Sequence, residues 1–146
     1  MADFEKAFAK TIKAEGGYVN NPNDKGGETY MGITRKNHPK LNMWKIIDFY
    51  KTNVPNRKPK ELNSILCRIK DIQEEVKTVY RKNYWNPIKL DMIYSQRIAN
   101  QFFDISVNCG TYSAIKAMQR VAGVKETGKL DDKTIDYYVK RHKRKS

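Results

Sequence analysis

Residues 15–34, with the sequence EGGYVNNPNDKGGETYMGIT, decide the fold that we expect of this chain. The stretch opens on Glu15 and carries five glycines, one proline and three asparagines between positions 16 and 34. These residue types favour turns, and the only extended-looking pieces are 18–19 and 29–31. We therefore expect loops and a small β-hairpin here rather than a helix.

A helix is expected directly before this stretch. Apolar residues and one threonine recur there at helical spacing, namely Phe4, Ala7, Phe8, Thr11 and Ile12. Asp3 can complement the N-terminal end of the helix dipole, and Gly16 and Gly17 end the helix. Glu15 thus falls at the C-terminal end of an amphipathic helix.

The rest of the chain is predicted to be mainly helical. After a mostly irregular region at 37–60 with a short helix at 44–50, Pro59 begins the longest helix, which runs to about Tyr84. Further helices are expected at 95–108, 113–122 and from 131 onward. The first of these should bury one side, formed by Ile98, Phe102, Ile105 and Cys109. The predicted fold class is mainly α, an α+β domain with a small β-hairpin and loop region after its first helix.

Composition sets the class of protein. A chain of 146 residues fits one domain, and 39% hydrophobic residues with 11% aromatics fit a folded globule despite a mean hydropathy of -0.80. The formal net charge of +13 favours contact with polyanions, among them nucleic acid, anionic lipid and anionic cell-wall polymers. No nucleic-acid motif is present, so we expect no specific nucleic-acid partner.

The sequence also indicates a compartment. No run is apolar enough to span a bilayer, and the first fifteen residues lack the apolar region of a signal peptide. We expect synthesis in a reducing cytosol, with Cys67 and Cys109 as ordinary buried thiols. His38 and His142 are isolated, and neither a metal spacing nor a phosphate-binding loop occurs. The sequence predicts no metal and no cofactor.

Carboxylates around the glycine-rich loop point to acid-base chemistry. Two acids held beside a cleft are the minimum equipment for cleaving a glycosidic bond. Glu15 is the leading general-acid candidate, because a helix C-terminus raises a carboxyl pKa and the two glycines leave room for a sugar. Asp24, with the Thr29 hydroxyl, can hold a water on the far face of the sugar. Glu28 competes with Asp24 as the second carboxylate. Taken by itself, each of these acids could instead be a solvated residue with no catalytic role, at a helix end or in a turn.

Other side chains are candidates for substrate binding. Four aromatic residues could stack on sugar rings or bond to them, namely Tyr18, Tyr30, Tyr84 and Trp85. Asp104 and Asn108 lie four apart and share a helix face, so Asn108 could bind an N-acetyl group. The bland alternatives are core packing for the aromatics and a structural hydrogen bond or helix cap for Asn108.

Residues 15–34 as a whole resemble the opening of glycoside hydrolase family 108, the phage-type N-acetylmuramidases. The resemblance continues at 84–87 (YWNP) and 103–110 (FDISVNCG), and 117–120 (AMQR) with 128–130 (GKL) resembles the family's predicted peptidoglycan-binding segment. The resemblance implies a lysozyme-like domain over 1–137, with a catalytic lobe at 1–90, a helical lobe at 95–137 and a basic tail at 138–146.

The family's catalytic acid falls on Glu15. Its activity implies cleavage of the β-1,4 bond between N-acetylmuramic acid and N-acetylglucosamine in bacterial peptidoglycan. The chain then resembles a bacteriolytic phage or prophage endolysin, a monomer released to the wall by a holin. Asp24 and Thr29 resemble part of the Glu, Asp, Thr triad of other phage lysozymes, although their separation is one residue shorter.

Other functions stay open at this point. A lytic transglycosylase cuts the same bond with one Glu and no water, leaving a 1,6-anhydro end. A non-catalytic basic protein that binds cell wall or nucleic acid would explain the charge but not the 15–34 motif. An accessory factor is a third alternative, because some relatives have been described as secretion activators.

Overall fold

The structure, a computed structural model, describes residues 2–12, 17–20, 23, 27–53 and 59–145. The chain groups into two compact units, Met1–Thr11 with Tyr80–Ser146 (unit 1) and Ile12–Val79 (unit 2). We expected lobes at 1–90 and 95–137. The observed division falls earlier and assigns the first helix to the C-terminal unit, because Phe4 packs there against Trp85 and Phe103, with ring centroids 5.5 and 5.8 Å away.

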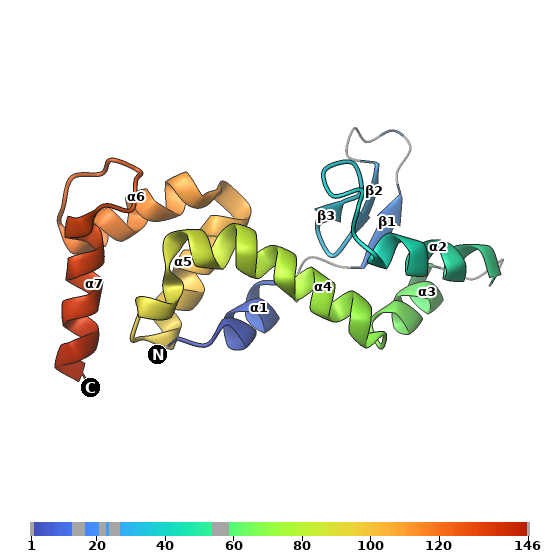
Figure 1. The fold of residues 1–146 in the computed structure, drawn as a ribbon, viewed down its shortest axis with the longest axis horizontal. Coiled ribbons are helices and arrows are strands. Elements are labelled where there is room, and N and C mark those ends of the chain that lie inside the picture. The colour runs from blue at the N-terminus through green and yellow to red at the C-terminus, as the bar shows by residue number, and fades with distance from the viewer. Residues whose placement is uncertain (1, 13–16, 21–22, 24–26, 54–58, 146) are drawn as a thin grey trace. The chain divides into compact units, whose positions relative to one another are not determined.

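Unit 2 contains the predicted hairpin, extended by one strand (Figure 1). Strands β1 (Tyr18–Asn20), β2 (Glu28–Tyr30) and β3 (Ile33–Thr34) form an antiparallel sheet in the order β1-β2-β3. The β2–β3 turn places Met31 at φ 49° and Gly32 at φ 82°. Two successive positive φ values are what a tight two-residue hairpin turn requires. The sheet prediction for residues 16–34 is therefore confirmed for the residues described.

Three helices complete unit 2: α2 (Met43–Asn53), α3 (Pro59–Leu66) and α4 (Lys70–Tyr80, of which Tyr80 is grouped with unit 1). The short helix expected at 44–50 is present as α2 and buries Met43, Trp44 and Ile47. The single long helix expected from Pro59 to about Tyr84 is wrong, because the chain breaks it at residues 67–69. There the backbone N–H groups of Arg68 and Ile69 turn to carbonyls three residues back, which tightens and ends α3.

The break escaped prediction because the apolar stripe continues through it. Leu62 and Leu66 before the break are buried, as are Ile72 and Val76 after it. No proline or glycine marks the position in the sequence. The apolar periodicity therefore indicates which residues are buried, but it does not indicate that they belong to two separate helices.

Unit 1 contains α1 (Phe4–Ile12, of which Ile12 is grouped with unit 2), the π-helix η1 (Arg81–Trp85), two 3-10 turns η2 (Asn86–Ile88) and η3 (Leu90–Met92), and helices α5 (Gln96–Cys109), α6 (Thr111–Ala122) and α7 (Asp132–Lys145). A π-helix leaves carbonyls without their usual partners. The buried Ser106 hydroxyl on α5 supplies one of these partners by donating to the Tyr84 carbonyl at 2.8 Å.

Helices α5 and α6 confirm the predicted positions. The Ser95 side chain caps α5 by accepting from the Ile98 N–H, and Gly123 ends α6 in the left-handed conformation. The buried side of α5 is not the predicted one. It consists of Ala99, Phe102, Phe103 and Ser106, so only Phe102 is shared with the prediction. Ile98 and Ile105 are half-buried and Cys109 is exposed at the helix end, because Ser106 is needed at the π-helix.

The C-terminal prediction also needs correction. A basic tail was expected at 138–146, after a helix that begins near residue 131, but the helix α7 continues to Lys145. Asp131 starts the helix by accepting from the Thr134 N–H at 3.0 Å. Lysine and arginine are good helix formers and are favourable near a helix C-terminus, so charge does not end the helix.

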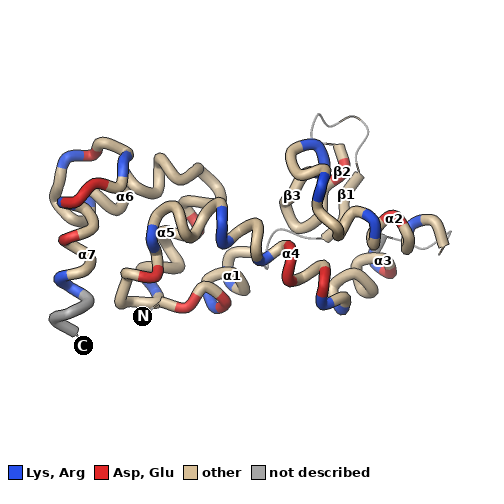
Figure 2. Tube along the Cα trace, in the orientation of Figure 1, with Lys and Arg blue, Asp and Glu red and all other residues tan. Residues whose placement is uncertain are grey.

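Surface features complete the picture. Cys67 and Cys109 are free and exposed, so the prediction of buried thiols is wrong. Cys67 falls in the break after α3, where its thiol donates to the Ser64 carbonyl. Lysine and arginine occur along most elements of both units rather than in one segment (Figure 2). No helix among the described residues is both long and apolar enough to cross a membrane.

Candidate active site

The sheet of unit 2 sorts the candidate residues onto two faces. Tyr18 pairs with Tyr30 and Val19 with Thr29. Side chains alternate along a strand, so Tyr18, Glu28 and Tyr30 share one face and Thr29 lies on the other. Val19 on the Thr29 face is 54% exposed, whereas Tyr30 is only 1% exposed. Thr29 therefore lies on the more solvent-accessible face, and Tyr30 belongs to the core.

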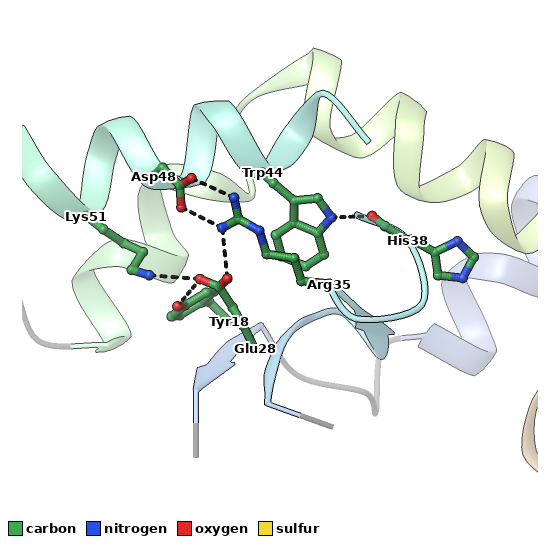
Figure 3. A network of polar contacts seen from close by, with 7 residues as sticks. All are labelled: Tyr18, Glu28, Arg35, His38, Trp44, Asp48 and Lys51. Atoms are coloured by element: carbon green, nitrogen blue, oxygen red, sulfur yellow. Dashed lines mark hydrogen bonds and ion pairs between the residues drawn. The ribbon is translucent and has the colours of Figure 1, made fainter. Parts of the chain in front are cut away.

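Glu28 is the centre of a polar network that joins the sheet to α2 (Figure 3). Its carboxylate accepts from Arg35 Nη1 at 2.9 Å and from Lys51 Nζ at 2.8 Å. The Tyr18 hydroxyl donates to the same carboxylate. Arg35 also holds Asp48 through two hydrogen bonds of 2.8 Å. We call these five residues the Glu28 cluster.

The cluster fixes the protonation state of its members. Burial raises the pKa of the Glu28 carboxyl, but its hydrogen-bond donors, Lys51 first, outweigh burial and hold the pKa below the ordinary value. Burial, aided by the bond to Glu28, raises the pKa of the Tyr18 phenol. At neutral pH Glu28 is therefore an ionised acceptor, which is the wrong state for a general acid.

This electrostatic arrangement predicts a pH-dependent contribution to stability. A carboxyl with a lowered folded pKa stabilises fully above the unfolded value of 4.5, and loses that contribution as the pH falls through the lower folded value. We expect the melting-temperature difference between wild type and Glu28→Gln to be largest near about pH 7 and to shrink below about pH 4. Thermal melts across this range measure it, and a constant difference would contradict the assignment.

Gly17, the last residue of the Glu-Gly-Gly motif, lies against α3. A Cβ on Gly17 would meet the Asn63 side chain at 2.4 Å. That side chain is held in place, because its Oδ1 accepts from the Tyr18 N–H at 2.7 Å. Gly17 does not have a positive φ, so space rather than backbone conformation requires glycine here.

The close approach predicts the outcome of a double-mutant cycle. Gly17→Ala should destabilise the protein by about 1–3 kcal/mol, because the added methyl group displaces the Asn63 amide. Asn63→Ala removes the clash, so the alanine at position 17 should cost less in that background. Chemical denaturation of the four proteins measures both steps. Equal costs in the two backgrounds would contradict the steric argument.

A pocket of about 270 Å³ opens beside Gly17 within unit 2. Seven residues line it: Ile12, Gly17, Tyr30, Met31, Asn63, Cys67 and Gln73. Ile12 and Gly17 are the described residues on either side of 13–16, the segment that carries Glu15. The pocket is thus the cavity that the sequence associates most directly with the predicted acid.

The two predicted catalytic carboxylates, Glu15 and Asp24, lie outside the described residues, so their roles stay predictions. Thr29, Tyr18, Glu28 and Tyr30 are brought together on one small sheet. The remaining candidates, Tyr84, Trp85, Asp104 and Asn108, belong to unit 1.

Trp85 needs a correction as a sugar-stacking candidate. It is fully buried between Phe4 and Phe103, and its indole N–H donates to Asp91 at 2.8 Å. A ring without exposed surface offers no face to a sugar, so Trp85 is a core residue. Tyr84 is half-buried.

The polar pair on α5 is satisfied within its own helix. The Asn108 amide donates to the Asp104 carbonyl at 2.9 Å and to its carboxylate at 3.1 Å. Both residues are exposed. The bonds match the structural alternative that the sequence left open, and the sugar-binding role of the pair stays a prediction.

The sequence analysis did not identify several residues of the site. Asp48 and Lys51 lie three apart on α2, a spacing that puts both on one helix face and could have indicated that they join one polar cluster. Arg35, Asn63 and Gln73 carried no signal, because their partners are distant in the sequence. Among the described residues, no group of three or more His, Cys, Asp or Glu side chains could hold a metal ion.

A mainly helical chain with a small three-stranded antiparallel sheet fits the class of lysozyme-like α+β proteins. The chain belongs to the glycosyl hydrolase 108 family, whose model matches residues 8–110. The match includes Glu15, Asp24 and the whole sheet, and it ends before α6. It confirms the resemblance to this family, whereas the role of residues 111–145 as a peptidoglycan-binding segment stays a prediction.

A solved structure supports the same fold. That of Brucella abortus SagA is similar to this chain with a TM-score of 0.58 and 28% identity, covering 94% of this chain and 68% of SagA. The comparison with curated proteins gave no match. Family membership makes the chain a glycoside hydrolase, and the family acts on peptidoglycan.

Proposed function

We propose that the protein is an N-acetylmuramidase, which hydrolyses the β-1,4 bond between N-acetylmuramic acid and N-acetylglucosamine. The observation that carries the proposal is the family match over residues 8–110, which contains the Glu15-Gly16-Gly17 motif and the loop after it. Glu15 protonates the leaving oxygen, and the second carboxylate guides the attacking water or stabilises the oxocarbenium-like transition state.

Asp24 is the better second carboxylate, since the contacts of Glu28 argue against a direct role for it. The Glu28 carboxylate is only 13% exposed and is bonded to Arg35 and Lys51. A carboxylate that must hold a water needs a lone pair directed at the substrate, whereas both oxygens of Glu28 are occupied by Arg35, Lys51 and Tyr18. In this proposal Glu28 positions the strand that follows the Asp24 loop, and Thr29 lies next to it on the more accessible face.

The net charge of +13 fits the same substrate. Bacterial walls and envelopes carry anionic polymers, and a positive field raises the encounter rate with them. Salt should therefore weaken the association with whole walls more than the cleavage of short neutral glycans. We infer that the protein acts on the wall after release from the cytoplasm of the cell that makes it, as an endolysin does.

Mass spectrometry of the products tests the reaction. Purified peptidoglycan is digested with wild type and, in parallel, with Glu15→Gln. Reducing N-acetylmuramic acid ends from wild type alone are the expected result. Anhydro ends would instead make the protein a lytic transglycosylase. The absence of new ends would leave a basic wall-binding protein, and would overturn the proposed activity.

A further inference from the structure

The pocket beside Gly17 has polar groups whose orientation is fixed by the backbone. A backbone N–H can only donate, so the Asn63 atom that accepts from Tyr18 must be Oδ1, which leaves Nδ2 as the other amide group. Gln73 is fixed in the opposite sense, because its Nε2 donates to the Leu66 carbonyl at 3.3 Å and to Tyr30 at 3.1 Å. Its Oε1 is therefore the remaining group.

Among the described residues, the two amide side chains thus keep one group each without a partner, a donor on Asn63 and an acceptor on Gln73. Within the described part of the chain, Asn63 Nδ2 donates to no acceptor and Gln73 Oε1 accepts from no donor. The other lining groups are mostly apolar, among them the buried Ile12 and Tyr30 and the half-buried Met31. A donor, an acceptor and an apolar wall are the complement of an acetamido group, with its carbonyl, N–H and methyl.

We propose that this pocket binds the acetamido group of one N-acetylated sugar residue, with Asn63 Nδ2 donating to its carbonyl and Gln73 Oε1 accepting from its N–H. The inference rests on the proposed function, because it places the glycan beside the segment that carries Glu15. The volume of about 270 Å³ lies just below the roughly 300–1,000 Å³ of sites for drug-sized ligands, so it suits a single sugar residue.

The two cysteines provide a probe and its control. Cys67 lines the pocket and is exposed, whereas Cys109 is exposed at the end of α5 in unit 1. A sugar in the pocket shields the first thiol and leaves the second accessible. The glycan can therefore be followed by the rate at which a maleimide labels each cysteine, without any measurement of catalysis.

The experiment uses the full chain with Glu15→Gln, so that the glycan is not cleaved. Its probe is soluble, uncrosslinked strands of alternating N-acetylglucosamine and N-acetylmuramic acid. At about ten times the Kd, only about a tenth of the protein stays free, so labelling of Cys67 should slow about tenfold while labelling of Cys109 is unchanged. Cellohexaose, which has the β-1,4 backbone but no acetamido groups, should protect neither thiol.

A conservative variant tests the named hydrogen bond. Asn63→Asp keeps an oxygen for the Tyr18 N–H and replaces the donor with a second acceptor. Protection of Cys67 should be lost, and in the active protein KM should rise about tenfold with kcat nearly unchanged, as expected for lost ground-state binding. An unchanged melting temperature separates this from a folding defect. Retained protection in Asn63→Asp would overturn the assignment.

The outcomes also separate this inference from the proposed function. Cleavage of peptidoglycan by wild type with no protection of Cys67 would overturn the pocket and leave the muramidase intact. Protection of Cys67 by the glycan without any cleavage by wild type would support the pocket and overturn the activity. Equal protection by cellohexaose would show that the acetamido group is not what the pocket recognises, and would also overturn the inference.

Discussion

Glu15→Gln is expected to lower the rate of peptidoglycan hydrolysis by about 10²–10⁴-fold, the range that a general acid contributes. Glutamine has the size of glutamate but has no proton to give to the leaving oxygen. The release of reducing ends from purified peptidoglycan measures the rate. Glu61→Gln is a matched control, because Glu61 is exposed on α3 and its change should leave the rate within about twofold.

The second carboxylate can be assigned in the same assay. If Asp24 guides the water, Asp24→Asn should lower the rate by more than Glu28→Gln does, and its melting temperature should stay near that of wild type. Glu28→Gln should instead lower the melting temperature clearly and the rate by less, because it breaks the contacts to Arg35 and Lys51.

For the acid itself, a Glu15→Gln protein that keeps more than about a tenth of the wild-type rate would contradict the role of Glu15.

Trp85→Ala is expected to destabilise the protein by about 3–5 kcal/mol, the usual cost of removing a large buried aromatic side chain. Trp85 is fully buried, its ring lies 5.7 Å from that of Phe103, and Asp91 accepts its indole N–H. Truncation leaves a cavity in the core and deprives the Asp91 carboxylate of a donor. Chemical denaturation, followed by circular dichroism, measures the loss.

The control for Trp85 is an aromatic residue at the surface. Phe49 on α2 is 56% exposed, and Phe49→Ala should cost less than about 1 kcal/mol. Trp85→Phe should be intermediate, since it keeps an aromatic ring but loses the hydrogen bond. If Trp85 were instead a platform for sugar, Trp85→Ala would raise KM while leaving the free energy of unfolding unchanged.

Local patterns were reliable where the cause is local. The turn residues of 15–34 predicted loops and a small hairpin, and strands β1 and β2 pair there as expected. The tight turn at Met31 and Gly32 belongs to β3, which was not predicted. The apolar spacing of α1 predicted Phe4, Ala7, Phe8 and the rest of its buried side, and all of these residues are buried. The helices expected at 95–108 and 113–122 likewise lie close to the observed bounds of α5 and α6.

Patterns failed where a distant partner decides. The stripe through α3 and α4 gave no sign of the break at 67–69, and the phase of α5 was shifted because Ser106 bonds to Tyr84, 22 residues earlier. Burial of the thiols was predicted from residue type, yet both are exposed at helix ends. Cys67 follows a helix end that the sequence did not predict, whereas Cys109 lies at the predicted end of α5. Propensity cannot report a contact with a residue that is remote in the chain.

The sequence alone determined the family, the positions of most helices, the hairpin and the candidate acid at Glu15, because each depends on residues that are neighbours in the chain. The tertiary structure decided that Glu28 is an ion-pair partner of α2, that Trp85 belongs to the core, and that Asn63 closes against Gly17. Tyr18 and Asn63 are 45 residues apart, and only folding brings the N–H of one to the amide of the other. The sequence specifies which chemical groups are present, whereas tertiary packing determines which partners set the charge and the exposure of each group.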